Sequence, residues 1–154
     1  MSDDHLHRRL ACLGNTPVHR LGLACNYGIT GHGLRYAVED RGLNFIFWTP
    51  RMRWITPTLR DLLKSSDRRL VVASMVNLGY MPWMVRRSLE QSLRALGVDA
   101  IDIFLLGWLG VATAGSDAVL DQMRALRQAG KVRAIGCSIH NRPQIGRASC
   151  RERV

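Results

Sequence analysis

The chain has 154 residues, enough for one domain with a hydrophobic core, and 47% of them are hydrophobic, as is usual in globular proteins. No apolar run reaches the roughly 18 residues of a membrane span, and no apolar signal-peptide segment follows the polar N-terminus, so we predict a cytoplasmic protein outside the membrane. The net charge of +10 raises the question of nucleic acid, but the arginines are scattered singly or in pairs without a basic, aromatic-rich stripe. No nucleic-acid partner is therefore expected.

Residues 1–16 are rich in charged and polar side chains and are predicted to form an N-terminal arm. His5 and His7 lack a third ligand at a suitable spacing, so no metal site is predicted there. The four cysteines show no C-x-x-C spacing, which favours reduced thiols.

Five apolar segments follow the arm and are predicted to be strands, at residues 17–25, 43–49, 70–76, 101–106 and 131–138. The intervals between them carry apolar residues at helical spacing, such as Val85, Leu89 and Leu93. Thr56 is predicted to cap a helix whose first residue is Pro57, and Ser116 to cap another. The predicted helix stops are glycines, namely Gly42, Gly97 and Gly130.

Strands that start about every 25–30 residues, each joined to the next by a helix, indicate a parallel sheet in an α/β domain. Both a barrel and an open doubly wound sheet fit this alternation. The segment LGLAC at residues 21–25 lacks the G-x-G-x-x-G pattern of a dinucleotide-binding fold, which favours the barrel.

Several short motifs, in order along residues 17–144, resemble the aldo-keto reductase superfamily. They are LGL (21–23), GLNF (42–45), VVA (71–73), SLEQSL (88–93), LGVD (96–99), ID (101–102), LLGW (105–108), GKVRAIG (130–136) and Ser138. The resemblance implies a (β/α)8 TIM barrel that moves a hydride between NADPH and a small-molecule carbonyl. Residues 17–144 would then form an incomplete barrel, the five N-terminal βα units of eight.

The resemblance also identifies the positions of the family's catalytic Asp, Tyr, Lys and His. In this chain they hold Phe47, Met52, Met75 and Gly107, respectively. Carbonyl reduction needs an acid for the developing alkoxide and donors that polarise the carbonyl, and none of these four side chains supplies either. Arg51 lies close by in the sequence, but an arginine does not release its proton near neutral pH. We therefore expect no retained catalytic residue and an inactive chain.

On the cofactor side, the resemblance assigns Ser138 to the serine that holds the nicotinamide amide, while the neighbouring asparagine position holds Ile139. NADPH is thus expected in the full-length parent and no cofactor in this fragment. Residues 145–154 (IGRASCRERV) resemble one reading frame of a sequencing adapter, so we expect them not to be native and the chain to be truncated at its C-terminus.

Three functions stay open at this stage. The parent could be an NADPH-dependent oxidoreductase with rebuilt chemistry, or a non-catalytic barrel that senses the cofactor or binds a partner. A different reaction using residues at the barrel mouth, such as His140 and Arg51, is the third. The four tryptophans, Trp48, Trp54, Trp83 and Trp108, are interpreted either as pocket walls or as packing under loops. The oligomeric state is open.

Overall fold

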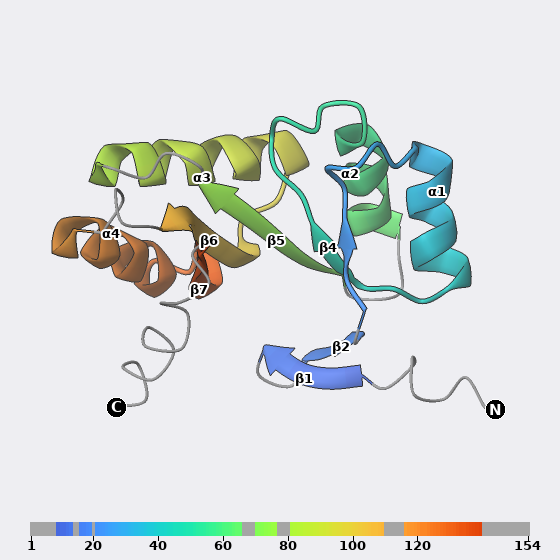
Figure 1. Cartoon of the computed structure of the whole chain (residues 1–154), viewed down its shortest axis with the longest axis horizontal. Coiled ribbons are helices and arrows are strands. Elements are labelled where there is room, and N and C mark those ends of the chain that lie inside the picture. Colours follow the sequence, from blue (N-terminus) through green and yellow to red (C-terminus); the bar gives the residue numbers. More distant parts are fainter. Residues whose placement is uncertain are drawn as a thin grey trace.

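A parallel sheet of five strands forms the centre of the computed structural model, which describes residues 9–13, 16–19, 21–65, 70–76, 81–109 and 116–139. Each strand lies beside the one that precedes it in the chain, in the order β3-β4-β5-β6-β7 (Figure 1). The strands are Leu23–Ala24, Phe45–Phe47, Val71–Val76, Ile101–Leu109 and Val132–Ile139. The α/β class and the parallel order predicted from the sequence are confirmed.

Helices connect successive strands of this sheet. α1 (Gly31–Arg35) continues directly into a π-helical turn, η2 (Tyr36–Asp40), and α2 (Thr56–Ser65), α3 (Pro82–Leu96) and α4 (Asp117–Gln128) follow. The helix stops predicted at glycines are confirmed by backbone φ angles of +71° at Gly42, +68° at Gly97 and +70° at Gly130. Within the part of the chain that the structure describes, no helix is both long and apolar enough to cross a membrane.

The sequence predicts hydroxyl side chains, Thr56 and Ser116, as the N-caps of two helices, and the structure confirms one of them. Ser116 caps α4 as predicted, because its Oγ accepts from the backbone N–H of Val119 at 3.4 Å. Thr56 does not act as predicted: it is the first residue of α2, and its hydroxyl donates to the backbone carbonyl of Met52 at 2.9 Å. The interpretation of Thr56 as the cap is therefore wrong, since its side chain holds the preceding turn instead of a helical N–H.

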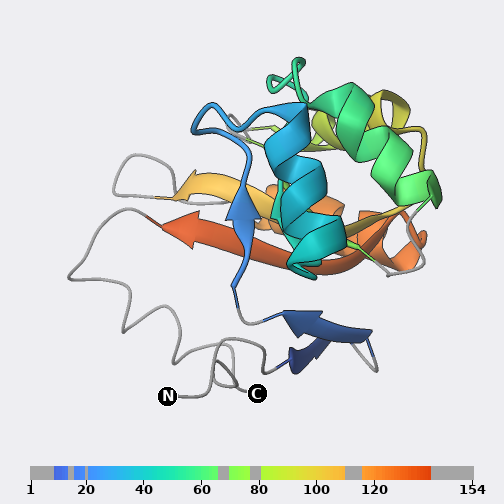
Figure 2. The same cartoon turned by 90° about the vertical axis from the view of Figure 1, so that its right-hand side faces the viewer.

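The segment at residues 17–25, predicted to be one strand, is two. β2 (Thr16–His19) pairs antiparallel with β1 (Arg9–Leu13), whereas β3 pairs parallel with β4. Within the arm predicted for residues 1–16, Arg9–Leu13 form a strand. Figures 1 and 2 both show this hairpin apart from the parallel sheet.

The side chain of Asn44 explains why the first predicted strand divides. Its Oδ1 accepts from the backbone N–H of His19 at 2.7 Å, and its Nδ2 donates to the carbonyl of Pro17 at 2.9 Å. These bonds tie the hairpin to the N-terminal end of β4. Three residues after His19 the chain passes Phe45 at Gly22, where a Cβ would lie 2.6 Å from the ring. The backbone therefore turns before it joins the parallel sheet.

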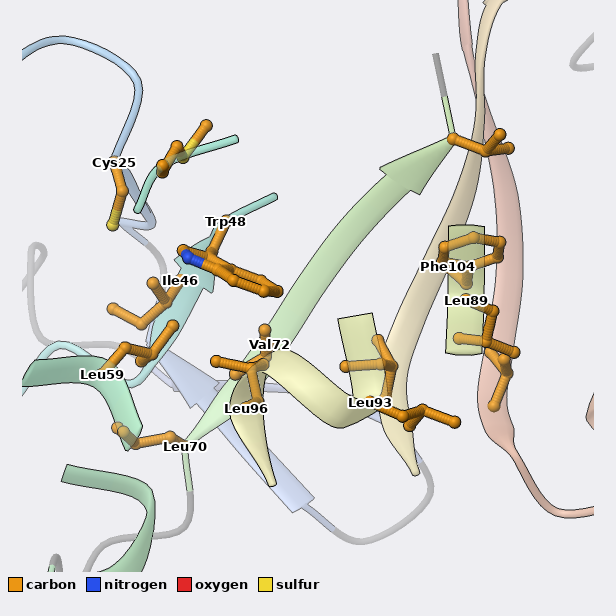
Figure 3. Close-up of a cluster of buried hydrophobic side chains, with 14 of the residues drawn as sticks. Cys25, Ile46, Trp48, Leu59, Leu70, Val72, Leu89, Leu93, Leu96 and Phe104 are labelled. Atoms are coloured by element: carbon orange, nitrogen blue, oxygen red, sulfur yellow. The ribbon is translucent and has the colours of Figure 1, made fainter. Parts of the chain in front are cut away.

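The hydrophobic core lies between the sheet and the helices. The hydroxyl of Ser74 on β5 lies 3.3 Å from that of Ser92 on α3, which places Ser74 on the helix-covered face. Because side chains alternate along a strand, Val72 and Val76 share that face, and both are buried. Figure 3 shows part of this cluster, whose labelled members include Ile46, Trp48, Val72, Leu89, Leu93 and Phe104.

Candidate functional site

Residues from four neighbouring strands meet at the C-terminal edge of the sheet. Phe47 ends β4, Met75 is the penultimate residue of β5, Gly107 lies near the end of β6 and Ser138 near the end of β7. Parallel strands bring their carboxyl ends to one edge, which is where α/β barrels carry their active sites. The predicted positions on the strands are therefore brought together, and Met52 lies in the turn that follows β4.

Met75 and Gly107 are in direct apposition. A Cβ built on Gly107 would lie 2.7 Å from the Sδ of Met75 and 2.7 Å from the carbonyl oxygen of Val76. Real Cβ atoms do not approach other atoms so closely, so position 107 has no room for a side chain in this arrangement. The thioether of Met75 fills the space, and neither position offers a proton or a charge.

Met52 is turned into the hydrophobic core. Its side chain is 6% exposed and belongs to the buried cluster. Its backbone carbonyl accepts from the hydroxyl of Thr56 at 2.9 Å, and the same hydroxyl accepts from Nε1 of Trp48 at 3.1 Å. This short network fixes the turn after β4. Phe47 is half-buried and also apolar. The positions equated with the catalytic Asp and Tyr, which hold Phe47 and Met52, therefore also carry no acid or base.

The buried thiol near this edge is not a nucleophile. Cys25 follows β3, and its backbone N–H donates to the carbonyl of Phe47 at 3.0 Å. Burial raises the pKa of the Cys25 thiol from 9.0 to about 11, because a thiolate would lose its hydration. A thiol that stays protonated near neutral pH does not attack a carbonyl.

Ser138 is half-buried on β7, the last strand of the sheet. His140 and residues 145–154 lie outside the described residues, as does the side chain of Trp108. Among the described residues, no group of three or more His, Cys, Asp or Glu side chains could hold a metal ion. Ser138 is thus the one predicted cofactor contact that can be placed.

A cleft of about 640 Å³ opens beside Met75, between the turn after β4, the end of β5 and the first turns of α3. Its walls include Arg51 and Arg53 from the turn and Trp83, Arg87, Ser88 and Gln91 from α3. Of the α3 residues, only Trp83 was predicted as a possible pocket wall, and Arg87, Ser88 and Gln91 were not. The signal that would have found Arg87 and Gln91 is helical spacing, because residues 83, 87 and 91 lie on one side of the helix.

The tryptophans were interpreted either as pocket walls or as packing under loops, and both roles occur. Trp48 is fully buried and packs under the turn after β4, whereas Trp83 is 61% exposed and lines the cleft. Trp54 is 56% exposed and donates through Nε1 to the carbonyl of Ile29 at 3.2 Å. Of these three tryptophans, Trp83 is the one that lines this cleft.

Comparison with known proteins gives a consistent result. The model of the aldo/keto reductase family matches residues 57–154. Rho crystallin from Rana temporaria is 33% identical over an alignment that covers 44% of this chain and 26% of the crystallin. The chain thus spans about a quarter of that curated relative.

Solved structures agree with the family match. An aldo-keto reductase from Bacillus halodurans in its holo form superposes with a TM-score of 0.74 at 19% identity, over 96% of this chain and 55% of the other. A glycerol dehydrogenase from Gluconobacter oxydans gives a TM-score of 0.72 at 24% identity, over 91% of this chain and 51% of the other. These likenesses establish the barrel fold, of which this chain spans about half.

Family members are oxidoreductases that generally use NAD(P)H and act on carbonyl substrates. The sheet order and the family match agree with the resemblance of the motifs. The chain belongs to the aldo/keto reductase family.

Proposed function

We propose that this chain is the N-terminal part of a non-catalytic member of the family, a barrel that binds NADPH as a sensor or interaction module and does not reduce carbonyls. The observation that carries the proposal is the contact between Met75 and Gly107. At the two positions equated with the catalytic Lys and His, a thioether fills the site and leaves no room for an imidazole.

The chemistry of carbonyl reduction explains why this substitution matters. The carbonyl must be polarised before the hydride arrives, and the alkoxide that forms must receive a proton. Phe47 and Met52 provide neither function, and Met52 is buried in the core. The guanidinium groups of Arg51 and Arg53 can polarise an oxygen but cannot act as the acid near neutral pH.

The cofactor part of the proposal rests on Ser138. Its hydroxyl is half-buried on β7 and fits a donor or acceptor for the carboxamide of a nicotinamide ring. NADPH, when bound, would supply a hydride. The role of Ser138 would be to orient the ring, and the phosphate contacts would come from sequence beyond residue 144, where we infer that the native chain continues in place of residues 145–154. A cytoplasmic location suits such a protein, since NADPH is abundant there.

The test uses the full-length protein with its native sequence after Gln144. We expect NADPH fluorescence to be quenched on binding, Ser138→Ala to weaken that binding by about tenfold, and Ser65→Ala, an exposed position on α2, to leave it unchanged. We expect no reduction of aldehydes or ketones above a blank without enzyme.

The outcomes separate the proposal from its alternatives. Carbonyl reduction at a rate well above the blank would overturn the non-catalytic assignment and support the second candidate, an oxidoreductase with rebuilt chemistry. Absence of NADPH binding would overturn the cofactor-sensing role.

A further inference from the structure

The cleft beside α3 is strongly cationic. Arg51, Arg53 and Arg87 reach it from two separate segments, the turn after β4 and the helix, and all three side chains are exposed. No acidic side chain is among the described residues that line it, and none of the three arginines forms an ion pair within that part of the chain. Three positive charges therefore face one cleft, and none of its described lining residues carries a counter-charge.

Arg86, the neighbour of Arg87 on α3, differs from it because its charge is paired. Arg86 pairs with Glu90 one turn further on, with 2.9 Å between Nε and Oε1, and it lies outside the cleft. The residue one turn beyond Arg87 is Gln91, which adds a neutral amide to the cleft wall. The charge of Arg86 is compensated on the helix, while that of Arg87 is available to a ligand.

The other walls of the cleft are suited to an organic group. The indole of Trp83 is 61% exposed, so a planar ring can stack on it. The hydroxyl of Ser88 adds a hydrogen-bonding group beside the arginines. The volume of about 640 Å³ lies within the range of about 300–1,000 Å³ that is usual for small-molecule sites.

We propose that this cleft binds a small phosphate monoester that carries an aromatic or other planar group. The planar fork of an arginine matches the oxygens of a phosphate and donates two hydrogen bonds at once. A phosphate monoester carries close to two negative charges at neutral pH, which three arginines can balance. The planar part of the ligand stacks on Trp83. This inference does not depend on the proposed NADPH binding at β7.

Phenyl phosphate is the probe, titrated calorimetrically into the 154-residue chain at low ionic strength. We expect saturable binding with one site, and a dissociation constant that rises at least about tenfold in Arg87→Gln because a charge-assisted bidentate contact is lost. Arg86→Gln is the matched control: it removes the same charge from the adjacent position of α3, and it should change the affinity less than about twofold. Arg53→Gln, in the turn outside the helix, should repeat the effect of Arg87→Gln.

A second comparison tests the stacking surface. Trp83→Leu should weaken phenyl phosphate but leave the weaker binding of inorganic phosphate unchanged, since the latter has no ring. The proposal is overturned if phenyl phosphate does not bind, if Arg86→Gln and Arg87→Gln weaken it equally, or if Arg53→Gln binds like the parent chain. Tighter binding of phenol than of phenyl phosphate would also overturn it.

Discussion

Phe104 and Leu105 are neighbours on β6 and similarly apolar, yet they occupy two different environments. Phe104 faces the helices and is fully buried, whereas Leu105 faces the opposite side of the sheet and is only half-buried. The same holds on β5, where Val76 is 3% exposed and its neighbour Met75 is half-buried. The helices cover one face of the sheet, and the side chains on that face form the hydrophobic core. The other face carries the candidate site; it is also apolar, but part of its side-chain surface stays exposed.

An apolar strand sequence therefore does not by itself predict which of its side chains are buried. On the covered face, α3 and α4 supply Leu89, Leu93 and Val119 as packing partners. On the other face, the partners in a closed barrel would come from further strands. Changes on the two faces should therefore have different effects, and the following experiments use that difference.

The largest expected effect is the loss of Phe104. Phe104→Ala should lower the free energy of unfolding of the chain by about 3–5 kcal/mol, because it removes a fully buried ring and leaves a cavity. Leu105→Ala on the same strand should cost less than about 1.5 kcal/mol, since its side chain already contacts solvent. Urea unfolding followed by circular dichroism measures both. Equal losses would contradict the contrast between the faces.

A side chain at position 107 tests the contact within the candidate site. Gly107→Ala should destabilise the chain by about 1–3 kcal/mol, because its Cβ meets the Met75 sulfur and the rigid carbonyl of Val76. Adding Met75→Ala should relieve part of this loss. Gly136→Ala is the control on the next strand, where the new Cβ would lie 3.0 Å from a flexible Leu105 methyl and should cost less. A neutral effect of Gly107→Ala would contradict the tight packing of Met75 and the Val76 carbonyl against position 107.

The pair of buried hydroxyls on the covered face should have a smaller effect. Ser92→Ala should cost about 1–2 kcal/mol, because it removes the neighbour of the buried Ser74 hydroxyl. Ser65→Ala on α2 also removes a serine hydroxyl that bonds a backbone carbonyl one turn earlier, but at an exposed position, and should change stability by less than about 0.5 kcal/mol. If both substitutions cost the same, the hydroxyl pair contributes nothing specific.

A further expected effect is a dependence of stability on alkaline pH. The Cys25 thiol stays protonated in the folded chain up to a pKa of about 11, whereas in the unfolded chain it loses its proton near 9.0. Between these values the unfolded state binds fewer protons, so stability should fall as the pH rises from 9 to 11. The slope should be shallower in Cys25→Ala, as measured by urea unfolding at several pH values. Parallel slopes in the two proteins would exclude Cys25 as the cause.

Much of the fold could be predicted from the sequence because its signals are local. The helical spacing of Val85, Leu89 and Leu93 and the glycine stop at Gly97 depend on residues within a few turns of one another. The apolar run that becomes β6 was recognisable for the same reason. The division of residues 17–25 was not, because it depends on Asn44, which lies 25 residues from its partner His19.

The candidate site shows the same limit. Its four strand positions could be named from the sequence, since parallel strands carry their ends to a common edge. The chain by itself determined that none of them holds an acid or a base. Only the tertiary structure decided that Met75 fills the place of a side chain at Gly107, and that Arg87 of α3 joins Arg51 and Arg53 around one cleft. These are contacts between segments that are distant in sequence, and packing alone sets them.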